Sequence, residues 1–353
     1  MTKYLRLLLL PFSVVYGLII LTRNKLYDIG VFKQTAFNLP IICVGNLVVG
    51  GSGKSPVTEY LVNLFPDKRI AILSRGYGRT TKGYILADAT ATAESIGDEP
   101  MQFYNKFPNV TVAVCEKRVA GINHLKSNHD LIILDDAFQH RSVKPGFSIL
   151  LFEYQKLLSL QLLLPAGNLR EPFFGYHRAQ ALLITKGPEN IEAHQKQACI
   201  RKFDKGAQQN LSFSFLTYGN LTHLFSKKEQ SLISVSGNTM VFLLTGIANP
   251  KPLLSQLQKY TKQINHSDYP DHYRFTVQNI QQLVNAFNNH PSEEKIIITT
   301  EKDAQRLLDD VLKELLLNLP VFYLPVKITL PEEDKTTFDK KILDYVSSTT
   351  RNR

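Results

Sequence analysis

The sequence predicts an α/β protein of two domains, the larger built around a mostly parallel sheet. Apolar runs at 40–46, 69–74, 110–114, 130–136, 147–152 and 181–185 are too short for most helices and do not alternate, which is typical of strands buried on both faces. Helical stretches such as 116–127 separate several of them. The chain has 353 residues, 44% of them hydrophobic and 20% charged, so it is long enough to bury two such cores.

A glycine-rich loop, GNLVVGGSGKSP at 45–56, follows the first of these strands and precedes a helical pattern. That order is the context of a phosphate-binding loop, whose general form is G-x-x-x-x-G-K-[ST]. Val48 stands where the first glycine is expected, but Gly50 and Gly51 would let the chain turn two residues later. The expected nucleotide-binding residues are Val48, Val49, Gly50, Gly51, Ser52, Gly53, Lys54 and Ser55. Lys54 would reach the β- and γ-phosphates, and the Ser55 hydroxyl would hold Mg²⁺.

Two adjacent carboxylates, Asp135 and Asp136, follow the apolar run LIIL at 131–134. At the end of a buried strand they would repel each other and need a nearby cation. The alternative is a polar loop with solvated acids. Because a phosphate loop is expected in the same sheet, the sequence favours a magnesium site here.

The pattern changes near residue 205. Segments 210–225 and 231–246 predict antiparallel strands with Gly-Asn turns at 219–220 and 237–238. An α/β alternation then returns, with strands expected at 240–245, 294–300 and 320–326 and a helix at 303–317. A second helix is expected at 277–287, where Val277, Ile280, Leu283, Val284 and Phe287 share one face. We therefore expect a β-ribbon connecting two α/β domains.

The N-terminal segment 1–30 has fifteen uncharged residues from Leu7 to Leu21, flanked by lysine and arginine. This run is shorter than the ~20 residues that span a bilayer, and Pro11 interrupts it. We interpret it as a membrane-surface anchor; the alternative is a helix packed on the protein's own core. The net charge of +10 indicates an anionic partner, but no zinc finger, aromatic RNA-binding motif or basic helix indicates nucleic acid. Three widely spaced cysteines predict core residues rather than disulfides.

Further polar clusters interrupt the pattern in a fixed order. They are SRGYGR (74–79), GDEP (97–100), DDAFQH (135–140), PAGNLREP (165–172), GIANP (246–250), PDHYRF (270–275) and TTEKDA (299–304). With the glycine loop, this series resembles the tetraacyldisaccharide 4'-kinases, the lipid A kinases of Gram-negative bacteria. The resemblance covers about residues 4–346.

The resemblance implies transfer of the ATP γ-phosphate to the 4'-hydroxyl of an acylated glucosamine disaccharide 1-phosphate. The cofactors would be ATP and Mg²⁺. The protein would be a monomer bound peripherally at the cytoplasmic face of the inner membrane. The implied domains are a membrane-surface segment (1–30), an ATP-binding kinase domain (31–208), a two-stranded ribbon (209–241) and a smaller α/β domain (242–353).

The same resemblance implies roles for individual residues. Asp98 and His272 would together activate the acceptor hydroxyl. Arg170 and His140 would contact phosphates, and Glu99 would lie near the magnesium ligands Asp135 and Asp136. The residues facing the substrate would be Arg75, Tyr77 and Arg118. The sequence departs from the family pattern at Ala137 and Asn168, where glycine and proline are expected, but neither position supplies a reacting group.

Two other functions are compatible with a phosphate loop. A GTPase or metal-chaperone switch would need a guanine-reading N-K-x-D element, and the sequence has none of that form. A non-catalytic membrane scaffold could retain the nucleotide fold without using Asp98.

Overall fold

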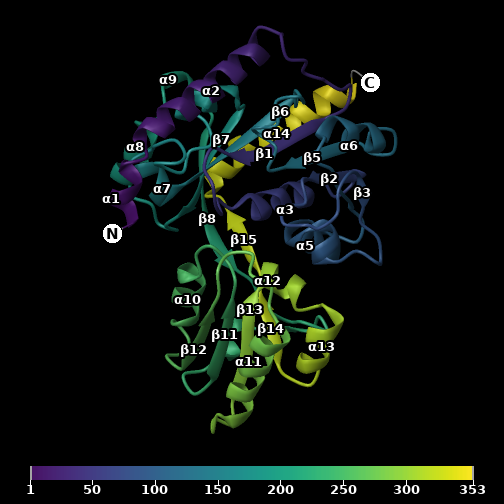
Figure 1. The fold of residues 1–353 in the computed structure, drawn as a ribbon, viewed down its shortest axis with the longest axis vertical. Helices are drawn as coiled ribbons and strands as arrows, with labels where there is room; N and C mark the ends of the chain where they lie inside the picture. Colours follow the sequence, from purple (N-terminus) through teal and green to yellow (C-terminus); the bar gives the residue numbers. More distant parts are fainter. Residues whose placement is uncertain (1, 352–353) are drawn as a thin grey trace.

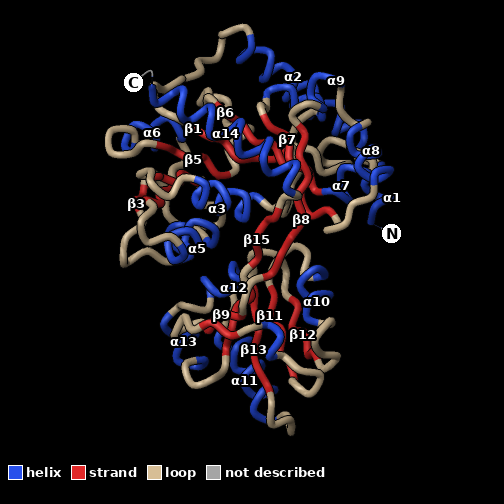
Figure 2. The backbone as a smooth tube through the Cα atoms, turned by 180° about the vertical axis from the view of Figure 1, so that it is seen from behind, coloured by secondary structure: helices blue, strands red, loops and turns tan. Residues whose placement is uncertain are grey.

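The computed structural model describes residues 2–351 and has a larger upper unit and a smaller lower unit (Figure 1). Two strands, β8 (Leu211–Tyr218) and β15 (Val326–Thr329), run between the units and pair antiparallel. The same two strands cross between the units in the reverse view (Figure 2). The fold is α/β with mostly parallel sheets, as the sequence predicts.

The upper unit is built on a nine-stranded sheet with the order β15-β8-β7-β6-β1-β5-β2-β4-β3. Pairing is parallel from β8 to β4 and antiparallel at both edges. Its remaining strands are β1 (Ile41–Asn46), β2 (Ile70–Ser74), β3 (Ile85–Leu86), β4 (Thr111–Val114), β5 (Leu131–Asp135), β6 (Phe147–Glu153) and β7 (Ala181–Gly187). Strands β1, β2, β5 and β6 are buried along their whole length, which explains their continuous hydrophobicity.

Helices cover both faces of this sheet, and each face has its own hydrophobic cluster. They are α3 (Lys54–Leu64), α4 (Ala93–Ile96), α5 (Asp98–Lys106), α6 (Arg118–Leu125), α7 (Tyr154–Leu158), α8 (Ala193–Ile200), α9 (Lys205–Gln208) and α14 (Glu332–Arg351), with a 3₁₀ turn at Phe173–Arg178. All three cysteines are buried and free, as expected.

The lower unit holds a six-stranded sheet with the order β10-β9-β14-β13-β11-β12. Its strands are β9 (Leu221–His223), β10 (Glu229–Gln230), β11 (Met240–Thr245), β12 (Ile264–Asp268), β13 (Lys295–Thr300) and β14 (Val321–Leu324). Its helices are α10 (Lys251–Leu257), α11 (Val277–Asn289), α12 (Glu301–Arg306) and α13 (Asp310–Leu316), with a 3₁₀ turn at Leu232–Ser234. The expected apolar face of α11 is buried at Ile280, Leu283 and Phe287, whereas Val277 is exposed.

Three expectations about the second half of the chain are wrong in detail. Strands β8 and β9 do not pair with each other, because β8 joins the upper sheet and β9 the lower one. The ribbon is therefore β8 with β15, not the segment 209–241, and 231–239 holds a 3₁₀ turn. The single helix expected at 303–317 is two helices, α12 and α13.

The C-terminal helix α14 was expected to belong to the smaller domain (242–353), but it packs on the upper unit. Its residues Phe338, Ile342 and Val346 pack in the same hydrophobic cluster as Val57 and Leu61 of α3. The chain thus returns through β15 to the upper unit and ends there (Figure 1). A sequence pattern cannot show this return, because it depends on which unit the amphipathic face of α14 covers.

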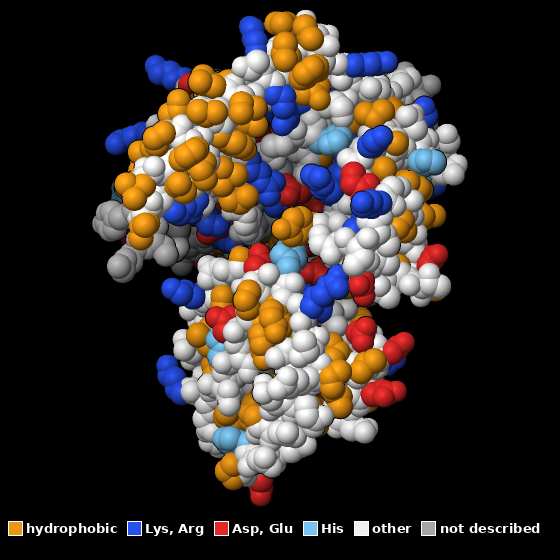
Figure 3. All heavy atoms as spheres, viewed as in Figure 1, with side chains coloured by type: hydrophobic (Ala, Val, Ile, Leu, Met, Phe, Trp, Pro, Cys, Tyr) orange, Lys and Arg blue, Asp and Glu red, His pale blue; other side chains and the backbone are white. Residues whose placement is uncertain are grey.

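The N-terminal helices α1 (Thr2–Leu7) and α2 (Leu10–Asp28) lie across the outside of the upper unit. The inner side of α2 is fixed by polar bonds: Ser13 Oγ donates to the Leu163 carbonyl at 3.1 Å, and Tyr16 Oη donates to that of Arg170 at 2.7 Å. Its outer side exposes the large apolar side chains of Phe12, Val15 and Ile19, and Leu8 just before the helix is exposed as well. Figure 3 shows hydrophobic side chains gathered over this part of the surface. Within residues 2–351 we find no helix with the length and apolar character needed to cross a membrane.

Candidate active site

The glycine loop has the geometry of an anion-binding loop. Helix α3 begins at Lys54 directly after Gly53, and no side chain caps its first N–H groups. Gly50 and Gly53 have φ of +98° and +84°, which only glycine adopts without strain. Uncapped N–H groups and the positive end of the helix dipole both favour a phosphate at this position.

Val48 is explained by its pairing. It forms an isolated antiparallel bridge with Leu169, and the Val49 N–H donates to the Asn168 carbonyl at 2.9 Å. A residue paired as in a strand needs no left-handed conformation, so glycine is not required at position 48. At Ser52 the loop is held by Asn46, whose Nδ2 donates to Ser52 Oγ at 2.6 Å.

The two aspartates lie beside this loop. Asp135 ends β5, the parallel neighbour of β1, and Asp136 follows with φ of +47°. The Asp136 carboxylate is 3.6 Å from Lys54 Nζ and 3.1 Å from Arg170 Nη1. These contacts bring three of the predicted site residues together at the carboxyl edge of the sheet.

Asp135 is buried at 1% exposure. Its oxygens accept long bonds from Thr58 Oγ1 at 3.5 Å and Ser74 Oγ at 3.4 Å. The pKa of Asp135 is raised to about 7, mainly by burial and also by the negative charges of Glu99 and Asp136, while Lys54 and Arg118 oppose the rise.

Mg²⁺ fits this donor set. A hydroxyl and carboxylates are the hard oxygen ligands that Mg²⁺ prefers. Within residues 2–351 no group of three or more His, Cys, Asp or Glu side chains could enclose a metal ion. Mg²⁺ beside a nucleotide is usually held by one or two protein oxygens and completed by water and phosphates.

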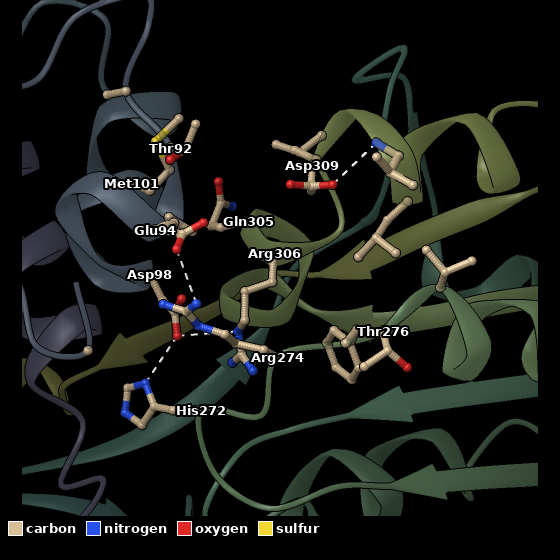
Figure 4. Close-up of a pocket in the computed structure, with 18 of the residues that line it drawn as sticks. Thr92, Glu94, Asp98, Met101, His272, Arg274, Thr276, Gln305, Arg306 and Asp309 are labelled. Carbon is tan, nitrogen blue, oxygen red and sulfur yellow. Dashed lines mark hydrogen bonds and ion pairs between the residues drawn. The ribbon is translucent and has the colours of Figure 1, made fainter. Parts of the chain in front are cut away.

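A second cluster joins the two units. Asp98 begins α5 in the upper unit, and His272 lies in the loop after β12 with φ of +58°. Asp98 Oδ2 is 3.0 Å from His272 Nδ1 and 3.2 Å from Arg306 Nε (Figure 4). Burial raises the pKa of Asp98, but the bond to His272 and the charge of Arg306 outweigh burial and hold that pKa below its usual value.

Lys302 fixes the proton of His272. Its Nζ lies 3.1 Å from His272 Nε2 and 3.2 Å from Glu99 Oε1. An ammonium can only donate, so Nε2 accepts and the ring proton is on Nδ1, facing Asp98. In this arrangement Nδ1 donates to the Asp98 carboxylate.

Lys302 and Arg306 are functional residues that sequence reasoning left without a role. Arg306 is buried and also contacts Asp303 at 2.7 Å and the carbonyl oxygens of Gly246 and Tyr273. The available signal was their position directly after strand β13, where polar residues follow an apolar run. Their partners Glu99 and Asp98 lie some 200 residues earlier, so spacing could not connect them.

The substrate-facing prediction holds only in part. Tyr77 is exposed and its ring centroid is 5.1 Å from that of His272, while Arg75 is also exposed. Arg118 is instead buried at 2% exposure, with Nη1 donating to the Cys115 carbonyl at 2.6 Å. Its backbone N–H donates to His140 Nε2 at 3.3 Å. Burial and the charges of Arg118 and Arg75 lower the pKa of His140 to about 4, so this imidazole is neutral.

A cavity of about 610 Å³ opens between the units beside Asp98 and His272 (Figure 4). Its polar wall includes Glu94 and Arg274, which form a 3.1 Å ion pair across the units. Its apolar wall comes from Met101, Phe275, Val277, Leu308, Val311 and Leu312. The space can hold a sugar-sized group with both polar and apolar contacts.

Comparison with known proteins agrees with this geometry. The family model described as LpxK, tetraacyldisaccharide-1-P 4'-kinase, matches residues 5–347. The curated tetraacyldisaccharide 4'-kinase of Bacteroides thetaiotaomicron is 42% identical, covering 98% of this chain and 94% of that protein. The one from Flavobacterium psychrophilum is 43% identical, covering 99% of both.

A solved structure is also similar over almost the whole chain. LpxK from Aquifex aeolicus in complex with ATP superposes with a TM-score of 0.76 at 32% sequence identity. The likeness covers 97% of this chain and 99% of the other. The fold is therefore shared over nearly the full length of both chains.

Proposed function

The chain belongs to the tetraacyldisaccharide-1-phosphate 4'-kinase family, and we propose that the cleft between its units is where it carries out that family's reaction. It is an ATP-dependent kinase of lipid A biosynthesis. The γ-phosphate of ATP is transferred to the 4'-hydroxyl of an acylated glucosamine disaccharide 1-phosphate. The observation that carries the proposal is the contact between Asp98 and His272, which joins the two units beside the phosphate loop.

Asp98 is the group that receives the acceptor proton. A sugar hydroxyl is a weak nucleophile, so a carboxylate must orient it and accept its proton as the new P–O bond forms and the bond to ADP breaks. A lowered pKa keeps Asp98 ionised and able to accept. His272 donates from Nδ1 to the same carboxylate and holds its orientation.

The phosphate side of the cleft stabilises charge on the transferring group. The uncapped N–H groups of α3 and the Lys54 ammonium bind phosphate oxygens, and Arg170 lies next to them through Asp136. Ser55 and Asp135, with Asp136 and Glu99 near them, would hold Mg²⁺, which neutralises phosphate charge when bound. His140, neutral and half-buried, can contribute a hydrogen bond but not a charge.

The acceptor enters through the cavity beside Asp98. Tyr77 and His272 form its mouth, and the Glu94–Arg274 pair closes one side. Because these residues come from both units, closing of the cleft would complete the site only when donor and acceptor are present.

The apolar patch of α1 and α2 gives a reason for a membrane-surface location. Its side chains are exposed although the inner side of α2 is bonded to the protein, and Arg6, Arg23 and Lys25 lie close to them in the sequence. Such a helix binds in the interface, with apolar side chains in the lipid and basic ones at head groups. We place this protein peripherally at the cytoplasmic face of the inner membrane, where ATP and the lipid acceptor meet.

The test is incubation of the protein with ATP, Mg²⁺ and an acylated glucosamine disaccharide 1-phosphate. Mass analysis is expected to show one added phosphate, absent with the Lys54→Met variant. Replacing ATP by GTP distinguishes the kinase from a GTPase switch. Turnover with GTP alone, or no transfer to the lipid at all, would contradict the kinase assignment.

A further inference from the structure

Behind the active site, one lysine joins three helices that each carry part of the reaction. We propose that Lys106 is a positioning residue: an ionic tie that holds the phosphate-loop helix α3, the Asp98 helix α5 and the lower-unit helix α12 in their reactive arrangement. This rests on the proposed function, because it concerns the arrangement that the transfer needs.

The tie is a carboxylate–ammonium–carboxylate bridge. Lys106 Nζ, at the end of α5, lies 2.8 Å from Glu59 Oε2 on α3 and 2.7 Å from Glu301 Oε1 on α12. The other oxygen of Glu59 accepts from Gln102 Nε2 at 2.7 Å. All members are largely withdrawn from solvent, with side-chain exposures of 5% for Glu59, 10% for Glu301 and 23% for Lys106.

The lower unit depends on this lysine most. Glu301 Oε2 is buried and has no hydrogen-bond partner among residues 2–351, so Lys106 is the only ion-pair partner of Glu301 there. Beside it, Asn105 Nδ2 donates to Gln305 Oε1 at 2.7 Å, a neutral contact between the same two helices. The pKa of Glu59 is raised to about 7, mainly by burial and also by the charge of Glu301, while Lys106 opposes the rise. Without the lysine, two buried carboxylates would face each other across the boundary.

Each helix in the tie begins at or carries a residue of the site. Helix α3 starts at Lys54, and Glu59 lies five residues farther along. Helix α5 starts at Asp98, and Lys106 is its last residue. Helix α12 starts at Glu301 and carries Lys302 and Arg306, which contact His272 and Asp98. Since helices are stiff over one or two turns, fixing these ends restrains the three catalytic ends relative to one another.

None of the three side chains touches Asp98, His272 or the phosphate loop through any contact found in residues 2–351. Their effect on the reaction is therefore indirect. It would be seen as a lower kcat with ATP binding retained, because the phosphate loop belongs to the upper unit alone.

The experiment compares Lys106→Met, Glu301→Gln and the double variant with wild type, in the full-length protein. Lys106→Met is expected to lower kcat at least tenfold and to leave the Kd for ATP within about twofold. Adding Glu301→Gln to Lys106→Met removes one of the two opposed charges and is expected to restore kcat at least threefold. Lys335→Met is the matched control: it breaks a 2.8 Å lysine–aspartate pair inside α14 and should leave kcat unchanged.

Glu301→Gln alone keeps the Lys106–Glu59 ion pair and nearly the same side-chain shape. It therefore still tests the proposal if Lys106→Met does not fold. It is expected to lower kcat about threefold or more with an unchanged melting temperature. Wild-type kcat for Lys106→Met and Glu301→Gln would overturn the tie. So would a double variant no better than Lys106→Met, since that places the whole effect in the Glu59 contact. Absence of transfer by wild type would instead reject the proposed function.

Discussion

Replacing Asp98 by Asn removes the proton acceptor and keeps the shape of the site. The amide oxygen can still accept from His272 Nδ1, and Asn occupies nearly the same volume. An amide cannot take the proton of a sugar hydroxyl. The expected result is loss of phosphoryl transfer with ATP binding unchanged.

The catalytic loss should exceed the structural one. General-base catalysis contributes about 10²–10⁴-fold in rate, which corresponds to about 3–5 kcal/mol in activation free energy. The free energy of unfolding should fall by only about 1–2 kcal/mol, because a single hydrogen-bonded charge contact is lost. Arg306 retains Asp303 at 2.7 Å and the carbonyl oxygens of Gly246 and Tyr273.

The assay is the single-turnover rate of transfer at saturating ATP and acceptor, with ATP affinity by calorimetry and unfolding measured on the same preparations. His272→Gln is the companion variant, since it removes the orienting ring but leaves the carboxylate. A rate for Asp98→Asn above one tenth of wild type would refute the general-base role. A parallel loss of ATP affinity would show that Asp98 serves nucleotide binding instead.

Three further predictions concern the loop before Asp98, the metal site and the membrane surface. Gly97→Ala should destabilise the protein by about 1–3 kcal/mol and lower kcat, because Gly97 has φ of +98° and a Cβ there would lie 3.0 Å from the Tyr77 carbonyl oxygen. Thermal unfolding and the transfer rate test this prediction, and an unchanged stability and rate would contradict the expected strain. The raised pKa of Asp135, about 7, means that the carboxyl is protonated below that pH and ionised above it. The Mg²⁺ concentration for half-maximal rate should therefore rise up to about tenfold per pH unit below 7, and equal Mg²⁺ requirements at pH 6 and pH 8 would contradict the assignment. Phe12 and Ile19 lie on the exposed side of α2, with 65% and 60% of their surface exposed. The double variant Phe12→Glu/Ile19→Glu should float less well with anionic vesicles while its melting temperature stays unchanged. Undiminished flotation would exclude this patch as the anchor.

The parts of the site that could be predicted from sequence are those with a local signal. Gly50, Gly53 and Lys54 lie between a strand and a helix, and the Asp135–Asp136 pair directly follows an apolar run. Each could be recognised within a window of about a dozen residues. The pairing of Asp98 with His272 was predicted only through the family resemblance, and in the structure the two lie within hydrogen-bond distance.

What the sequence could not provide depends on contacts between distant segments. The ribbon pairs β8 with β15, more than 100 residues later, and the Gly-Asn pairs predicted a local hairpin instead. Lys302 and Arg306 gain their roles only when α12 packs on α5. Arg118 was assigned to the substrate side by the family resemblance, whereas its guanidinium donates to carbonyl groups inside the fold.

The measurement that tests the central claim most directly is to locate the phosphate in the product. The acylated glucosamine disaccharide 1-phosphate is incubated with ATP, Mg²⁺ and the wild-type or Asp98→Asn protein, and the product is analysed by ³¹P–¹H correlation. We predict one new phosphomonoester coupled to the proton at the 4' carbon with wild type, and none with Asp98→Asn. A phosphate at another hydroxyl, or ATP hydrolysis without any lipid product, would contradict the account.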